Sequence, residues 1–320
     1  MIKFLDFFKK NRLLIILANA LVFTCGCSTP EKDQPAVKDR YITLNGTKIH
    51  YTSCGEGPVY VFVHGGFGDS YMWRNVMPIV ANKGKCIAID LPGFGKSEKP
   101  LLDYTPQLQA KFLQTFIDSL ELNDIVLIGQ DWGASLCLDY FSRAEHKVRG
   151  LVLSEPILSH PTQKDLDDIS SNLARKLLEL RMDSSLDYKV LNQNYISTNI
   201  LPLLTKSKWA DTVLQHYTTP YQSATDRRAQ LAFISAFPIN GLPDASIHFI
   251  DLYRGAFFRS DAPKIIFLNN DNVYLSEPGI DFLKSKLKNT SFPYLDAGFL
   301  HAEDQPEKMA NEILKTFANQ

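Results

Sequence analysis

The chain has 320 residues, of which 45% are apolar and 22% are charged. This composition is typical of a packed globular protein, and it excludes a disordered chain, a collagen-like fibre and a polytopic membrane protein. The formal net charge of −1 gives no basic surface of the kind that binds nucleic acid, so we expect no nucleic-acid partner.

The five cysteines have neither the paired CxxC spacing nor the Cys/His spacing of zinc ligands. They therefore indicate neither a metal site nor a disulfide framework. We expect Cys54, Cys86 and Cys137 to be small buried residues.

The N-terminus has the pattern of an export signal. Four basic residues and one acidic residue within positions 3–12 precede an apolar run at 13–23, which is too short to span a bilayer comfortably. Gly26 then precedes Cys27, a pairing that resembles the lipobox of bacterial lipoproteins. Cleavage of the signal peptide 1–26 would leave Cys27 as the lipidated N-terminus, on the periplasmic side of a bacterial membrane or on the outer membrane. The alternative is an uncleaved N-terminal anchor, which also places the fold outside the cytoplasmic membrane.

A polar stretch separates this signal from the first predicted strands. Residues 27–39 are expected to form a solvated tether. Two runs, 41–44 and 48–52, then flank Asn45-Gly46, a dipeptide typical of β-hairpin turns.

The remaining elements alternate between strand and helix. Short apolar runs predict buried strands at 59–63, 85–90, 125–128, 148–153, 264–268 and 291–295. One predicted helix begins at Pro106 with Thr105 as its N-cap, and others occupy 134–143 and 306–318. This alternation predicts an α/β fold with a mainly parallel central sheet and helices on both faces.

Residues 158–238 interrupt the alternation with a mostly helical pattern that is too long for a loop. We interpret this segment as a helical cap subdomain, inserted into a core made of residues 40–157 and 239–320. Between strands of such a sheet, the cap would lie over their carboxyl ends, where α/β folds bind ligands.

A G-x-D-x-G pentapeptide, residues 129–133, directly follows the predicted strand 125–128 and opens the next helix. Two glycines that flank the central residue permit a sharp strand-to-helix turn, which projects the central side chain above the sheet. Asp131 occupies this position, where many hydrolases place serine, and is therefore a candidate nucleophile. The alternative is that Asp131 only caps the following helix.

Two further features favour the nucleophile. His64-Gly65-Gly66 follows the strand 59–63, and a glycine turn of this kind presents backbone N–H groups to an oxyanion. The N–H groups of Gly66 and Trp132 would form that oxyanion hole, and His64 would fix the turn by a local hydrogen bond. His301 follows the last predicted strand, where the chain order nucleophile, acid, histidine places a base.

Four segments carry a family resemblance: Val63-His64-Gly65, Tyr71-Met72-Trp73-Arg74-Asn75-Val76, Asp90-Leu91-Pro92-Gly93-Phe94-Gly95-Lys96-Ser97 and Gln130-Asp131-Trp132-Gly133. Together they resemble the α/β-hydrolase superfamily and, more narrowly, the haloalkane dehalogenases, from about residue 41 to the C-terminus. The resemblance implies that Asp131 is the alkyl-accepting nucleophile, that the Trp132 indole N–H binds the departing halide, and that His301 is the base.

Aspartate in place of serine suits a substrate whose reacting carbon is saturated. The carboxylate displaces halide and forms an ester on Asp131, and His301 then activates the water that hydrolyses this ester. The expected activity is cleavage of carbon–halogen bonds in small haloalkanes, giving alcohol and halide. The expected partners are a small apolar halogenated substrate, water and, through the lipid anchor, a membrane. No cofactor is implied, and we expect a monomer.

Two acids are candidates to orient His301. Glu155 follows the strand 148–153, at the position used by one dehalogenase branch. Asp271 follows the strand 264–268, at the position used by other branches and by most α/β hydrolases. Without a catalytic role, Glu155 would be a hinge residue that fixes the inserted cap. Asp271 would then only hydrogen-bond within its own turn. We favour Glu155, because the rest of the resemblance is closer to the first branch.

Gly66 departs from that branch, which usually has asparagine after His-Gly as the second halide donor. Some branches take this donor from a cap tryptophan, but we interpret Trp209, the only tryptophan of the predicted cap, as a packing residue. Half of the halide site is therefore unassigned.

Three alternatives stay open. Epoxide hydrolases share the nucleophile and the base but need cap tyrosines; the candidates are Tyr188, Tyr195, Tyr217 and Tyr221. Fluoroacetate dehalogenases bind the substrate carboxylate through arginines, whereas we interpret Arg227-Arg228 as an exposed pair. The non-enzymatic alternative is a lipoprotein that retains the scaffold as a binding module.

Overall fold

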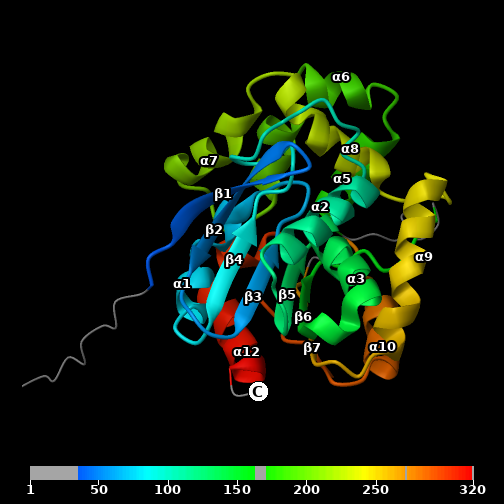
Figure 1. The fold of residues 1–320 in the computed structure, drawn as a ribbon. Helices are drawn as coiled ribbons and strands as arrows, with labels where there is room; N and C mark the ends of the chain where they lie inside the picture. The colour runs from blue at the N-terminus through cyan, green and yellow to red at the C-terminus, as the bar shows by residue number, and fades with distance from the viewer. Residues whose placement is uncertain (1–34, 163–170, 271, 319–320) are drawn as a thin grey trace, which may run out of the picture. The chain divides into compact units, whose positions relative to one another are not determined.

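An eight-stranded sheet with helices on both faces forms the fold (Figure 1). The computed structural model describes residues 35–162, 171–270 and 272–318. The predicted signal peptide, Cys27, most of the tether and Asp271 lie outside the described residues. Within these ranges, no helix is long and apolar enough to cross a membrane.

The sheet is parallel except at one edge. The strands are β1 (Lys38–Leu44), β2 (Thr47–Cys54), β3 (Val59–Val63), β4 (Lys85–Ile89), β5 (Ile125–Gln130), β6 (Val148–Ser154), β7 (Lys264–Phe267) and β8 (Thr290–Ser291). Their order is β1-β2-β4-β3-β5-β6-β7-β8, with antiparallel pairing only in β1–β2 and β2–β4. The order reverses beside β3, and Val63 pairs with Gly129 of β5 there, so the loops after β3 and β5 start side by side.

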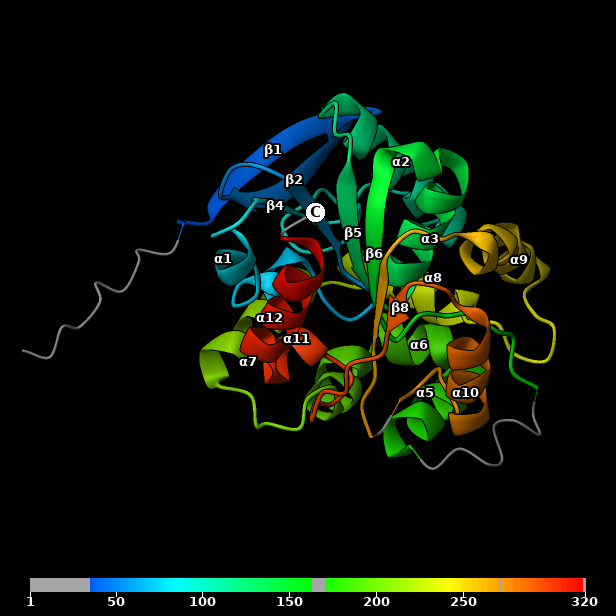
Figure 2. The same cartoon turned by 90° about the horizontal axis from the view of Figure 1, so that it is seen from below.

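The α-helices of the described residues lie between the strands and after them. They are α1 (Met77–Val80), α2 (Pro106–Ser119), α3 (Trp132–Ala144), α5 (Asn172–Met182), α6 (Leu186–Leu191), α7 (Asp211–Thr218), α8 (Arg228–Ala236), α9 (Asp244–Arg259), α10 (Glu277–Lys286), α11 (His301–Asp304) and α12 (Pro306–Phe317). Figure 2 shows α2, α3 and α9 on one side of the sheet and α1 and α12 on the other.

Alternate residues of each central strand enter two different cores, because successive side chains of a strand point to opposite faces. In β3, Val61 packs in the core that includes α2 and α3, while Phe62 packs in the core that includes α1 and α12. Both faces of the sheet are therefore covered, as the apolar strand runs predict, and the predicted fold class is confirmed.

The element bounds agree closely with the sequence pattern, with one exception. The Thr105 side chain accepts the Leu108 N–H and caps α2, as predicted. The last predicted strand, 291–295, is wrong in extent, since β8 contains only Thr290–Ser291. Pro293 has no N–H to donate to the ladder, and the pairing continues only as an isolated bridge between Leu268 and Tyr294.

Helices α5, α6, α7 and α8 lie together beyond one end of the sheet (Figure 1). Ala174 of α5 and Phe233 of α8 line the same cavity as Gly66, which follows β3, and Asp131, which follows β5. The helices that occupy the predicted cap region therefore face the carboxyl ends of the parallel strands.

Candidate active site

Asp131 lies at the sharp turn between β5 and α3. Its backbone angles are φ 56° and ψ −130°, in a region that residues other than glycine rarely adopt. The flanking positions require glycine because the chain passes so close to itself. A Cβ on Gly133 would lie 2.3 Å from the Val63 carbonyl oxygen, and one on Gly129 would lie 2.6 Å from that of Gly133. The pentapeptide thus forms the strand–turn–helix geometry that it predicts.

The Asp131 side chain does not cap α3. Its Oδ2 accepts the Gly66 backbone N–H at 2.8 Å, while Oδ1 is buried without a close hydrogen-bond partner among the described residues. Gly65 passes against the same carboxylate, since a Cβ there would lie 2.5 Å from Oδ2. This placement favours the nucleophile over the helix cap.

Burial raises the pKa of Asp131 to about 6. Interactions with the Gly66 backbone N–H, the Tyr274 hydroxyl and the Trp132 backbone N–H act in the opposite direction. At neutral pH the group is therefore a desolvated carboxylate in which the Gly66 N–H holds Oδ2, and Oδ1 has no close hydrogen bond to the described residues.

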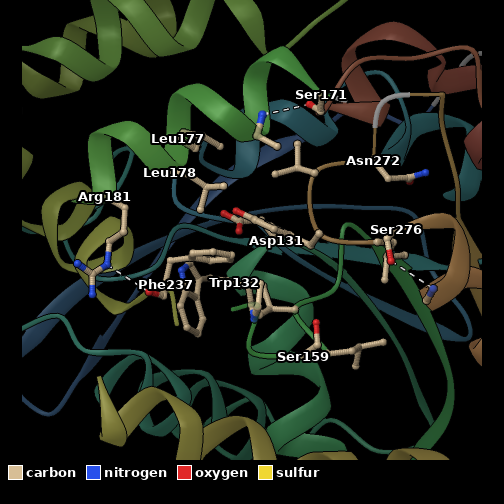
Figure 3. A pocket seen from close by; sticks show the side chains of 18 of the residues that line it. Asp131, Trp132, Ser159, Ser171, Leu177, Leu178, Arg181, Phe237, Asn272 and Ser276 are labelled. Atoms are coloured by element: carbon tan, nitrogen blue, oxygen red, sulfur yellow. Dashed lines mark hydrogen bonds between the residues drawn. The ribbon is translucent and has the colours of Figure 1, made fainter. Parts of the chain in front are cut away.

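Asp131 lies on the wall of a cavity of about 660 Å³, large enough for a small organic molecule (Figure 3). Leu177 and Leu178 of α5 lie on one side of the carboxylate, and Trp132 and Phe237 form an aromatic wall nearby. Leu177 and Leu178 of the predicted cap thus cover the buried carboxylate of Asp131 with apolar side chains.

Trp132, the predicted halide donor, lines this cavity, but its indole N–H is already donated. Nε1 donates to the Phe233 carbonyl oxygen at 2.9 Å, and the two rings lie 5.8 Å apart. Gly66 presents no side chain to the cavity. A halide would therefore have to replace the Phe233 carbonyl as the acceptor of the indole N–H.

His301 is buried at the start of α11 and is linked to Glu155 through Asn269. Asn269 Nδ2 lies 2.7 Å from His301 Nε2, 3.2 Å from Glu155 Oε1 and 3.2 Å from the Gly298 carbonyl oxygen. In the part of the chain that the structure describes, Glu155 makes no direct hydrogen bond to His301. Glu155 therefore reaches His301 only through the Asn269 amide. Asp271, the other candidate acid, lies outside the described residues, so the acid that orients His301 stays a prediction.

Glu155 is fixed from the other side by the loop that follows β7. Its Oε2 accepts the backbone N–H groups of Val273 and Tyr274 at 3.0 and 3.1 Å. Burial raises the pKa of Glu155 to about 7, and these N–H groups and Asn269 act against that shift. Burial also lowers the pKa of His301 to about 4. At neutral pH the imidazole is therefore uncharged, as a general base must be.

Two interpretations of buried side chains are confirmed. His64 Nδ1 lies 2.7 Å from the Gly65 carbonyl oxygen and its Nε2 accepts the Leu91 N–H, so His64 fixes the glycine turn. Trp209, which is half-buried, donates its indole N–H to the Leu201 carbonyl oxygen and packs against the core.

The residues of the alternative functions lie elsewhere. Among the described residues, the cavity is lined by none of the four candidate cap tyrosines. Tyr217, for example, donates its hydroxyl to Glu303. Arg227 is 7% exposed and donates to the Tyr221 carbonyl oxygen, so its interpretation as an exposed residue is wrong. Its guanidinium folds back against that carbonyl just before α8.

The cysteines of the described ranges are buried, and the acidic side chains there form no metal site. Cys54, Cys86 and Cys137 are buried, as expected, with free thiols. Within the described ranges, no cluster of three or more His, Cys, Asp or Glu side chains could hold a metal ion.

Sequence reasoning missed three polar residues of the site. Asn269 lies just after the end of β7, where the sequence pattern predicts an acid and gives no sign that an amide contacts the histidine. Tyr274 and Arg181 line the cavity from the loop after β7 and from α5. No motif marks either of them, because their positions depend on how the predicted cap packs on the sheet.

The comparisons with known proteins agree with this geometry. A family model described as alpha/beta hydrolase fold matches residues 58–235. A haloalkane dehalogenase of Mesorhizobium japonicum is 30% identical over 272 residues, which cover 84% of this chain and 87% of that protein. Another, of Agrobacterium fabrum, is 29% identical over 266 residues, which cover 83% and 86%.

Two solved structures are similar over nearly the whole fold. The haloalkane dehalogenase DatA from Agrobacterium tumefaciens aligns with a TM-score of 0.80 at 28% identity, over 87% of this chain and 95% of that one. DbeA from Bradyrhizobium elkani aligns with a TM-score of 0.82 at 28% identity, over 88% and 97%. The chain therefore belongs to the alpha/beta hydrolase fold family and, within it, to the haloalkane dehalogenases.

Proposed function

We propose that the enzyme hydrolyses the carbon–halogen bond of small haloalkanes, giving an alcohol and a halide. The observation that carries this proposal is the Asp131 carboxylate on the cavity wall, with Oδ2 held by the Gly66 N–H and no close partner for Oδ1 among the described residues. A carboxylate with one free oxygen can displace a leaving group from saturated carbon and form an ester.

In the first step, Asp131 Oδ1 bonds to the halogen-bearing carbon as the carbon–halogen bond breaks. The halogen leaves with the bonding electron pair as halide. The Trp132 indole N–H would turn from the Phe233 carbonyl oxygen to this halide. The Tyr274 hydroxyl would supply the second hydrogen bond to the halide, because Gly66 has no side chain to do so. This hydroxyl interacts with the Asp131 carboxylate in the same cavity.

In the second step, His301 takes a proton from water while the water oxygen attacks the ester carbonyl carbon of Asp131. Negative charge then develops on Oδ2. The Gly66 N–H already points toward this oxygen, and the Trp132 backbone N–H also stabilises the charge. As the ester C–O bond breaks, the alcohol oxygen takes the proton from His301. The Asp131 carboxylic acid finally releases its own proton to solvent.

Bromide release from 1-bromohexane tests the proposal. Asp131→Ala is expected to abolish it, while the exposed control Asp103→Asn retains the wild-type rate. A single turnover in ¹⁸O-labelled water should place the label in the Asp131 carboxylate, as detected by mass spectrometry of its peptide. Bromide release that survives Asp131→Ala would refute the mechanism.

Styrene oxide in the same assay tests the epoxide hydrolase alternative. Tyr274 favours this alternative, because a phenol on the cavity wall can donate to the oxygen of an opening epoxide. Diol without bromide would move the proposal to epoxide hydrolysis. No turnover of either substrate would support the binding-module alternative.

We further propose that the enzyme is exported as a monomer and attached to a membrane by a lipid on Cys27. The support is the basic segment, the short apolar run and the Gly26-Cys27 pair near the N-terminus. A lipid followed by a polar tether would attach the enzyme to a membrane without a transmembrane helix.

A further inference from the structure

Arg181 places a positive charge on the wall of the Asp131 cavity. It lies in the last turn of α5, and Leu177 and Leu178 of the same helix line the same wall. Figure 3 shows its guanidinium beside Phe237, on the opposite side of the cavity from Ser276. Arg181 therefore adds a cationic group to a cavity whose lining mixes apolar residues with polar ones such as Asn272 and Ser276.

The guanidinium is held at one edge and free at the other. Its Nε donates to the Phe237 carbonyl oxygen at 3.2 Å. Its two terminal nitrogens make no hydrogen bond or ion pair with the described residues and are not enclosed. The Phe237 ring stacks on Tyr274, with centroids 5.0 Å apart, so the guanidinium is tied to the aromatic wall beside Asp131.

The other charged side chains of the cavity do not neutralise Arg181. His160 pairs with Asp251 at 3.2 Å, and the structure shows no ion pair between Arg181 and Glu277, which also lines the cavity. Burial lowers the pKa of Arg181, and no acidic side chain of the described ranges acts against that shift. The guanidinium stays charged at neutral pH. A basic residue in the last turn of a helix interacts favourably with the helix dipole. This interaction alone would not require Arg181 to line the cavity.

From this geometry we propose that the preferred substrates are halogenated carboxylates with the halogen at the end opposite the carboxylate. The two terminal nitrogens of Arg181 bind the carboxylate oxygens, and the halogenated end lies at Asp131 Oδ1. A partly buried guanidinium without an acidic partner binds a carboxylate favourably through two parallel hydrogen bonds. Much of the free-energy cost of removing water from the guanidinium has already been met by folding. The inference rests on the proposed carbon–halogen hydrolysis. Within that reaction it names the preferred substrates, which are haloalkanes that carry a carboxylate.

Bromide release from 6-bromohexanoate and from 1-bromohexane compares two substrates of equal chain length. We expect kcat/KM to be at least about tenfold higher for the carboxylate. Arg181→Gln should lower it for the carboxylate by about 10- to 100-fold, mainly through KM, and leave 1-bromohexane within about threefold. Arg181→Lys should restore part of the loss. Lys176→Gln, on the same helix but outside the cavity lining, should change neither substrate.

Hexanoate binding, measured by calorimetry, gives a readout that does not depend on turnover. Wild-type protein is expected to bind hexanoate, and Arg181→Gln to weaken the binding at least about tenfold. Absence of wild-type binding, or equal loss of turnover on both substrates in Arg181→Gln, would overturn the inference while leaving the proposed hydrolysis intact. No bromide from either substrate would instead refute the hydrolysis, and the hexanoate result would still decide the role of Arg181.

Discussion

The Asn269 amide contacts the imidazole of His301, the proposed base. Its Nδ2 lies 2.7 Å from His301 Nε2, so a neutral group contacts the imidazole directly. Glu155 reaches His301 through that amide, and burial rather than a nearby carboxylate dominates the pKa of the imidazole. Asn269 therefore positions the imidazole of His301, while Glu155 supplies the carboxylate behind it.

Two substitutions of Asn269 separate these roles. Asn269→Asp puts a carboxylate beside the imidazole and raises its pKa above the value of about 4. Because the base must be neutral, kcat of this variant should fall as the pH drops through the raised pKa, while the wild-type base stays neutral down to about pH 4. Asn269→Ala leaves the ring unheld and should lower kcat by about 10- to 100-fold at every pH, with little change in KM.

The measurement is the pH profile of kcat for both variants, beside the exposed control Asn82→Asp. Profiles of Asn269→Asp and wild type that superimpose would show that this amide does not act on the base. A parallel loss of folding stability, followed by urea denaturation, would separate a structural defect from a catalytic one.

The buried carboxylate of Asp131 sets a second pH dependence. Burial raises its pKa to about 6, and only the ionised form can attack. We expect kcat/KM for 1-bromohexane to be flat above that pH and to fall about tenfold per unit below it, since kcat/KM reports ionisation of the free enzyme. Initial rates of bromide release at substrate concentrations well below KM, between pH 4.5 and 9, measure this. A flat profile down to pH 5 would mean that the carboxylate is better stabilised than its surroundings indicate.

At the scale of elements, the turn between β5 and α3 depends on glycine for space. Gly133→Ala would put a Cβ 2.3 Å from the Val63 carbonyl oxygen and 2.4 Å from that of His64, both of them backbone atoms that cannot move independently of the sheet. We expect a loss of about 3 kcal/mol or more in the free energy of unfolding. Gly68→Ala, whose closest contact would be Met72 Sδ at 3.4 Å, is the matched control and should lose much less. Equal urea midpoints for the two variants would contradict this account.

The sheet could be predicted from the sequence because its strands are short apolar runs buried on both faces. Local patterns were sufficient at β3, whose bounds match the prediction, and failed at β8, where a proline interrupts the pairing. The Gly66–Asp131 contact was also predictable, since both residues follow adjacent parallel strands. The Trp132–Phe233 hydrogen bond was not predictable, because it joins α3 to the main chain of α8, about a hundred residues away.

At the scale of the whole molecule, the proposed chemistry and the proposed anchor occupy separate parts of the chain. Every side chain of the proposed mechanism lies within Gln34–Gln320, which forms one compact unit. The basic segment, the apolar run and Cys27 all precede it. Catalysis should therefore be independent of the anchor, which affects only where the enzyme works.

Two chains test this separation. A chain that begins at Gln34 should fold with the Tm of the full-length enzyme and keep its kcat/KM, because no proposed site residue is removed. In the full-length chain, Cys27→Ser should move the activity from the membrane fraction to the soluble fraction, while Cys25→Ser, two residues earlier, leaves it at the membrane. Activity lost on truncation would mean that the N-terminal residues contribute to the site. Membrane association that survives Cys27→Ser would refute lipidation at that cysteine and support the uncleaved anchor.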